Sequence, residues 1–138
     1  MQDLYIVDRK SGASGASLDD LCDQILRIDS SIRFVGIANK MGKTITAAYR
    51  KGSDHLLTED ESDLSTIESV LRMLTRGDLQ SKTGKPIYSF TLYEKVQRAT
   101  IPLDDDECPV LMVSFDIDGD TESLIKNKLL PRLKEWFN

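Results

Sequence analysis

The sequence predicts an α+β domain built on an antiparallel sheet, with its elements in the order α-β-β-α-β-β-β-α. Apolar residues recur at helical spacing in three segments, and short runs rich in β-branched and aromatic residues lie between them. The connections between successive strands are short, which favours antiparallel pairing. The 138 residues are enough for one domain with an ordinary core and no disulfide or metal support.

The first predicted helix begins at Ser17. The Ser17 hydroxyl can cap the helix, two aspartates suit its positive N-terminal end, and apolar residues recur at helical spacing up to Ile28. The run 11–16, just before it, consists of small residues and is typical of a linker. We therefore divide the chain into an N-terminal arm, residues 1–16, and a domain, residues 17–138.

A β-hairpin and a second helix follow. Residues 33–38 and 44–50 favour strands and flank a turn in which Gly42 reverses the chain. Thr58 and Glu61 have the spacing of a capping box, which predicts the start of the second helix. The apolar stripe of this helix consists of Leu64, Ile67, Val70, Leu71 and Leu74.

Three strands and a last helix complete the pattern. Residues 86–92 and 96–103 are joined by a tight turn. Residues 109–115 include a run that is apolar on both faces, which is typical of a central strand. The last helix is predicted to begin near Asp120 and to be kinked by Pro131, because proline cannot continue the helical hydrogen bonds.

This order of elements, over residues 17–137, resembles the roadblock/LC7 family and its profilin-like relatives. The resemblance implies a five-stranded antiparallel sheet in the order 2-1-5-4-3, with helices on both faces. The second helix would cross one face, and the two terminal helices would cover the other. The resemblance also implies a protein that is not catalytic, pairs through its second helix and third strand, and acts as a platform for small GTPases.

A more specific resemblance is to a small uncharacterised archaeal family of single-domain proteins with the same element order. The segments that carry it are residues 28–36, 39–43 and 93–96. This resemblance implies a similar length and layout and no known activity.

Composition and targeting patterns narrow the function. The formal charge is −5, which argues against binding to nucleic acid. The early apolar stretch is too short for a signal peptide or a membrane span, so we expect a cytoplasmic protein without membrane contact. Cys22 and Cys108 are expected to be buried thiols, with a disulfide between them as the alternative.

Short motifs of catalysis and metal binding are incomplete. Gly42-Lys43-Thr44 resembles the end of a phosphate-binding loop, but it leads into a strand where that loop must open a helix. Residues 116–120 resemble the start of an EF-hand loop but lack its later glycine and glutamate, which leaves only weak cation binding open. His55 has no nucleophile or metal ligands beside it. We therefore expect no enzymatic activity, no cofactor and no metal site.

Charges are segregated along the chain. Residues 31–53 carry basic side chains and no acidic ones, and residues 99–125 carry the reverse. In the 2-1-5-4-3 order, the turns after the first and fourth strands emerge at one end of the sheet. Candidate docking charges at this end are Lys40, Lys43, Asp104, Asp105, Asp106 and Glu107. The alternative is a solvated rim of compensating charges that stabilises the fold little.

The second helix and the third strand form the predicted partner surface. The candidate dimer interface combines the helix residues outside the stripe with the uncharged edge strand, and comprises Ser65, Arg72, Met73, Arg76, Tyr88 and Phe90. We expect a non-enzymatic, homodimeric interaction or regulatory module, with a small GTPase as the further partner that the resemblance implies. The alternative is a sensor domain that binds a small ligand between the sheet and the helices.

Overall fold

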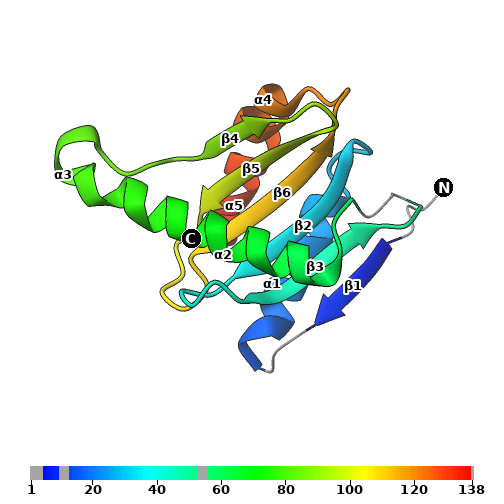
Figure 1. Ribbon diagram of the computed structural model, residues 1–138, viewed down its shortest axis with the longest axis horizontal. Coiled ribbons are helices and arrows are strands. Elements are labelled where there is room, and N and C mark those ends of the chain that lie inside the picture. The colour runs from blue at the N-terminus through cyan, green and yellow to red at the C-terminus, as the bar shows by residue number, and fades with distance from the viewer. Residues whose placement is uncertain (1–4, 10–12, 53–55, 138) are drawn as a thin grey trace.

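A computed structural model describes residues 5–9, 13–52 and 56–137, with side chains from Leu18 onward. The strands form one antiparallel sheet in the order β1-β3-β2-β6-β5-β4 (Figure 1). Their bounds are β1 Tyr5–Arg9, β2 Ile32–Ala38, β3 Thr44–Arg50, β4 Ser89–Leu92, β5 Val96–Pro102 and β6 Val110–Asp116. The five strands expected within residues 17–138 stand in the predicted 2-1-5-4-3 order, so the fold class is confirmed.

One strand and the start of one helix were not predicted. β1 lies within the segment that we set apart as an arm, and it extends the sheet by pairing with β3, with Val7 opposite Ala48. Helix α1 (Ala13–Leu26) begins at Ala13, not at Ser17. Residues 13–16 of the run that suggested a linker are helical, since small side chains without proline do not prevent a helix.

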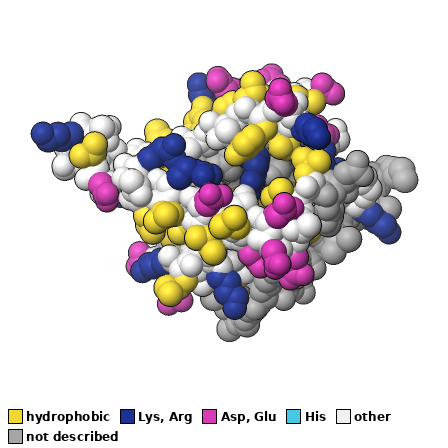
Figure 2. Space-filling model, in the orientation of Figure 1, with side chains coloured by type: hydrophobic (Ala, Val, Ile, Leu, Met, Phe, Trp, Pro, Cys, Tyr) yellow, Lys and Arg dark blue, Asp and Glu magenta, His cyan; other side chains and the backbone are white. Residues whose placement is uncertain are grey.

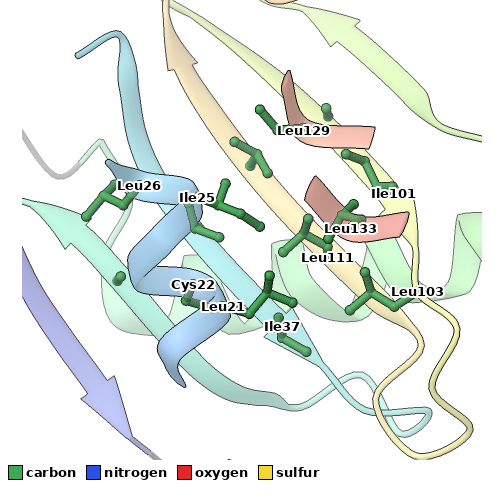
Figure 3. Packing of buried hydrophobic residues seen from close by; sticks show 14 of the residues in the cluster. Leu21, Cys22, Ile25, Leu26, Ile37, Ile101, Leu103, Leu111, Leu129 and Leu133 are labelled. Carbon is green, nitrogen blue, oxygen red and sulfur yellow. The ribbon is translucent and has the colours of Figure 1, made fainter. Parts of the chain in front are cut away.

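The helices lie on both faces of the sheet, as expected. Helix α1 and the C-terminal helices α4 (Thr121–Leu124) and α5 (Leu130–Trp136) cover one face, and α2 (Glu59–Arg76) crosses the other (Figure 1). The main core lies between the sheet and the first group of helices, where fully or nearly fully buried side chains pack together (Figure 3). Those labelled from α1 are Leu21, Cys22, Ile25 and Leu26. They share this core with Ile37, Ile101, Leu103 and Leu111 and with Leu129 and Leu133 of the C-terminal helices.

The last helix is irregular at the expected place. A π-helical segment, η2 (Ile125–Leu129), separates α4 from α5, and Pro131 follows directly in the first turn of α5. Proline has no N–H to donate, and its ring clashes with the carbonyl four residues earlier. The wider π turn accommodates this loss, so the predicted kink takes the form of a π segment.

Strand β6 is central, as its apolar pattern predicted. It pairs with β2 on one side and β5 on the other. Leu111 and Val113 pack into the main core, whereas Val110 and Met112 belong to a smaller cluster beneath α2. Alternate residues of one strand therefore serve two cores, which explains why the run is apolar on both faces.

Helix α2 begins with the predicted capping box. The Thr58 N–H donates to the Glu61 carboxylate at 2.9 Å, and the Glu61 N–H donates to the Thr58 hydroxyl at 3.2 Å. Beyond its last residue the chain continues through the short helices η1 (Gly77–Leu79) and α3 (Gln80–Thr83), which project past the sheet (Figure 1).

The face that α2 turns toward the sheet corrects our reading of its pattern. Its buried residues are Thr66, Ser69, Val70 and Met73, and the last two pack against the sheet. Met73, which we had placed outside the apolar stripe on the partner face, is only 5% exposed. The stripe residues other than Val70 point outward instead, with exposed fractions of 58% for Leu64, 48% for Ile67, 62% for Leu71 and 50% for Leu74.

Polar contacts explain this orientation of α2. The Thr66 hydroxyl lies 3.1 Å from that of Thr44 on β3, and Arg98 on β5 donates to the Ser65 hydroxyl at 2.5 Å. Small hydroxyl side chains let the helix lie close to the sheet while their polar groups stay bonded. Gly42 contributes as well, since a Cβ there would lie 3.1 Å from the Cα of Ile67.

Candidate functional site

The outward side of α2 carries an apolar stripe, which we call the outer stripe: Leu64, Ile67, Leu71 and Leu74. Their spacing places them on one side of the helix. Figure 2 shows hydrophobic side chains gathered along α2 on this face of the molecule. Exposed apolar groups that share one face of a helix are typical of a surface that binds another protein.

Strand β4 forms one edge of the sheet, next to this helix. It pairs with β5 alone, so its outer backbone groups have no strand partner in the described part of the chain. The exposed fractions are 36% for Phe90, 64% for Leu92 and 65% for Ile87, which precedes the strand. An uncharged, apolar edge of this kind favours the addition of a further strand.

A groove of about 270 Å³ lies between α2 and the hairpin formed by β4 and β5. Helix α2 contributes Arg72 and Arg76, β5 contributes Arg98, and Phe90 and Tyr93 supply aromatic rings. The remaining lining groups are hydroxyls, and no acidic side chain lines the groove. Figure 2 shows basic side chains beside this hollow, toward the C-terminal end of α2.

The structure distributes the candidate dimer residues over different environments. Arg72, Arg76 and Phe90 line the groove, and Ser65 accepts the hydrogen bond from Arg98. Tyr88 is half-buried and packs against the main core, on the face of the sheet opposite α2. Met73 is buried under the helix, as described above. As a dimer interface the set stays a prediction, and the outer stripe is the surface that sequence reasoning missed.

The candidate docking charges do lie at one end of the sheet. Ala38 is opposite Val110, which brings the turn 39–43 beside the loop 103–109 (Figure 1). The exposed charged residues of this end are Lys40, Lys43, Asp104, Asp106 and Glu107. Asp105 differs, because its carboxylate accepts the N–H groups of Glu107 at 3.0 Å and Cys108 at 2.8 Å and so shapes the loop. The docking role of this end stays a prediction.

At the opposite end of the sheet, two polar side chains hold the loops in place. Arg33 pairs with Asp116 at 3.1 Å. Arg50 donates to the carbonyls of Ile32 at 2.7 Å and Asp29 at 2.9 Å, and also to that of Leu26. Because Leu26 ends α1, the guanidinium also lies where a helix favours positive charge.

The loop that resembles an EF-hand is organised by an amide. The side-chain nitrogen of Gln97 donates to the carbonyls of Asp116 at 3.1 Å, Ile117 at 3.1 Å and Gly119 at 2.9 Å. Gln97 is buried at 7% exposure, so a side-chain amide occupies the space toward which the carbonyls point. Within the described ranges no three potential metal-ligating side chains gather, here or elsewhere.

The other motifs have simple structural roles. Lys43 leads into β3, as the strand context predicted for the sequence Gly42-Lys43-Thr44. Cys22 and Cys108 are both free, buried thiols, and burial raises the pKa of each. Neither thiol is therefore activated as a nucleophile. His55 lies outside the described residues.

No described helix is both long enough and apolar enough to cross a lipid bilayer.

Comparison with known proteins identifies the architecture. The gliding protein MglB of Thermus thermophilus superimposes with a TM-score of 0.68 at 10% identity, over 92% of this chain and 96% of that one. The chain has the fold of roadblock/LC7 domains. A structure of MglB with a tetrameric arrangement gives 0.67 at 11% identity, over 93% and 96% of the two chains. A roadblock/LC7 domain from Streptomyces avermitilis gives 0.58 at 12% identity, over 83% and 90%.

Neither a protein-family model nor a curated protein sequence matches the chain.

Proposed function

We propose that this roadblock/LC7-type protein is a non-enzymatic interaction module that works as a homodimer. The observation that carries the proposal is the outer stripe of α2, whose leucine and isoleucine side chains are about half exposed or more. A second copy related by a two-fold axis would cover the stripe with its own, because an isologous interface places the same patch on both subunits. The structure of MglB with a tetrameric arrangement supports self-association in proteins of this fold.

The edge strand β4 supports the same dimer. It lies at the rim of the sheet beside α2, and Leu92 and Ile87 stay exposed there. In a two-fold dimer, β4 of each copy would run antiparallel to its mate and satisfy the open backbone groups. Helix contact and strand pairing would then form one continuous interface.

Sedimentation velocity over a range of concentrations tests the dimer. We expect wild type to sediment as a dimer and Leu71→Glu to sediment as a monomer, because a carboxylate would be buried against apolar side chains. Ile117→Glu is the matched control, since Ile117 is 42% exposed and lies after β6, away from α2. A wild-type monomer at every concentration, or equal effects of both substitutions, would contradict the proposed interface.

We further propose a small GTPase as the partner of the dimer, on the strength of the roadblock/LC7 fold. The exposed charges of the turn 39–43 and the loop 103–109 are the docking surface in this proposal. Charges at such a surface act mainly on the association rate. We also propose that the protein is cytoplasmic and that it is similar to a small uncharacterised archaeal family.

Titration against small GTPases from the same cell, loaded with GDP or with a GTP analogue, tests this partner. We expect binding to be weakened by the double change Asp104→Lys with Asp106→Lys, and to be unaffected by Ile117→Glu. The salt dependence of the association rate should fall in the charge-reversed variant. If the charge reversal does not change binding, the docking surface proposed here is wrong. If no GTPase binds, the proposed partner is wrong.

A ligand-binding role is the second candidate, and one observation favours it. The main core is filled by buried side chains (Figure 3), but a polar groove of about 270 Å³ opens on the other face, between α2 and the β4–β5 hairpin. Small-molecule sites combine apolar or aromatic surface with a few convergent polar groups, and this groove has both kinds of lining. Saturable binding of a small ligand at this groove would support the role.

A further inference from the structure

Three guanidinium groups converge on the groove between α2 and the β4–β5 hairpin. Arg72 and Arg76 stand one turn apart on α2, and Arg98 reaches the groove from the middle of β5. Among the described residues none of the three forms an ion pair, and no carboxylate lines the groove. In a chain with a formal charge of −5, three arginines thus share one groove that no carboxylate lines.

Arg98 is the least exposed of the three. It is partly buried, and its hydrogen bond to the Ser65 hydroxyl at 2.5 Å uses one of five N–H donors. Burial lowers the pKa of the Arg98 guanidinium, an effect that nearby Tyr93 offsets and the positive charge of Arg72 reinforces. An arginine nevertheless stays charged at neutral pH. Arg98 and Arg72 line the same groove as like charges, and a bound anion would relieve their repulsion.

The other lining groups suit a phosphate group carried on a small organic molecule. Hydroxyls of Thr91, Thr100 and Tyr93 are neutral donors beside the arginines. Phosphate oxygens accept paired hydrogen bonds from a guanidinium, which favours arginine at phosphate sites. Phe90 and Tyr93 offer aromatic surface for the organic part. The volume of about 270 Å³ is below that of drug-sized sites, so the ligand is small.

We propose that this groove binds a small phosphate monoester, with Arg98 as the central contact and Arg72 and Arg76 as the outer ones. The proposal rests on the ligand-binding role put forward above and does not require the homodimer.

Calorimetric titration with phenyl phosphate, at constant ionic strength set with chloride, tests the proposal. We expect saturable binding of one molecule per chain. Arg98→Met should weaken it by about 10- to 100-fold, since charge-assisted hydrogen bonds to a partly buried arginine are lost. Arg72→Met, at an exposed position, tests the site without risk to folding. Arg132→Met, exposed on α5 on the opposite face, is the matched control and should bind like wild type.

Benzoate, titrated in the same way, separates failure of the phosphate assignment from failure of the site. Benzoate binding as tight as that of phenyl phosphate, and equally dependent on Arg98, would keep the ligand-binding role and overturn the phosphate assignment. Absence of saturable binding of either compound in the millimolar range would overturn both. Phenyl phosphate binding that survives Arg98→Met and Arg72→Met alike would place the anion elsewhere and overturn the proposal.

The same titrations in the Leu71→Glu variant show whether a second copy of the chain takes the place of the ligand. We expect this variant to bind phenyl phosphate like wild type. If instead Arg98→Met abolishes self-association and phosphate does not bind, the groove receives acidic residues of another copy, and the phosphate proposal is wrong.

Discussion

Replacing Leu71 and Met73 by alanine, one at a time, tests the orientation of α2. These residues are two positions apart and of similar size, yet Leu71 is 62% exposed and Met73 is 5% exposed. Deleting a buried methionine side chain to alanine costs about 2–5 kcal/mol, so we expect the free energy of unfolding to fall by about 3 kcal/mol in Met73→Ala.

The cost of Leu71→Ala follows from the same arithmetic. Full burial of the leucine groups that alanine lacks is worth about 2 kcal/mol, from about 0.8 kcal/mol per methylene. Because the side chain is 62% exposed, less than half of that is realised in the single chain. Alanine is also the better helix former. We therefore expect a loss below about 1 kcal/mol.

Urea unfolding followed by far-ultraviolet circular dichroism measures both changes. With a slope of about 2 kcal/mol per molar urea, the midpoint should fall by about 1.5 M in Met73→Ala and by less than about 0.5 M in Leu71→Ala. Dilute protein isolates the single chain, because dimerisation adds a concentration-dependent term. If Leu71→Ala costs as much as Met73→Ala at the lowest concentration, α2 presents its apolar stripe to the sheet, and the partner surface proposed here does not exist.

Three further predictions concern loops. Gln97→Leu should lower the free energy of unfolding by about 2 kcal/mol in urea titrations, because three carbonyls lose their donor. An unchanged midpoint would show that Gln97 does not organise the loop. Gly42→Ala should cost about 1–3 kcal/mol and more than Gly52→Ala, because both have positive φ but only Gly42 lies against α2; equal costs would show that contact to be unimportant. Hydrogen bonds from Ser31 hold the pKa of Asp29 below 3.8, so the stabilisation by Asp29 is present above that pH and lost as pH falls through the lowered pKa. The stability difference between wild type and Asp29→Ala, about 1 kcal/mol at neutral pH, should vanish in acid, and a pH-independent difference would refute the mechanism.

The sheet was predictable because local pattern and topology agree. The hairpin around Gly42, the capping box at Thr58 and the doubly apolar strand β6 each carry a signal that depends on neighbours in sequence. The apolar pattern of β6 also required a central position, and this is the position that the predicted order assigned to it. Strand β1 carried no comparable signal, since a strand of five residues pairs with β3 only after the chain between them has folded back.

The orientation of α2 could not be read from its periodicity. Helical spacing reveals that apolar residues share a side, but not whether that side meets the sheet or a partner. In this helix the inner face uses Thr66, Ser69, Val70 and Met73, and hydroxyls there find acceptors on the helix or partners on the sheet. A face of this kind looks half polar in sequence, so a rule that places the most apolar side inward chooses the wrong one.

The groove was hidden for a different reason. Its arginines come from the last turns of α2 and from the middle of β5, and these meet only through the way the helix lies across the sheet. One local signal was present: Arg98 is the only charged residue of β5, and it falls on the half-buried side that faces α2. A charged residue within a strand that is otherwise free of charge marks a place where that strand meets something polar.

The outer stripe and the arginine groove have one structural cause. Because α2 rests on the sheet through small hydroxyl side chains and two apolar ones, its leucines remain outside and its C-terminal arginines lie over β4 and β5. An inward-facing stripe would have turned the leucines toward the sheet and removed the apolar partner surface. The hydrogen bond from Arg98 to the Ser65 hydroxyl also ties the helix to the strand at the rim of the groove. The partner surface and the groove therefore lie on two sides of the same helix, and both depend on the way α2 rests on the sheet.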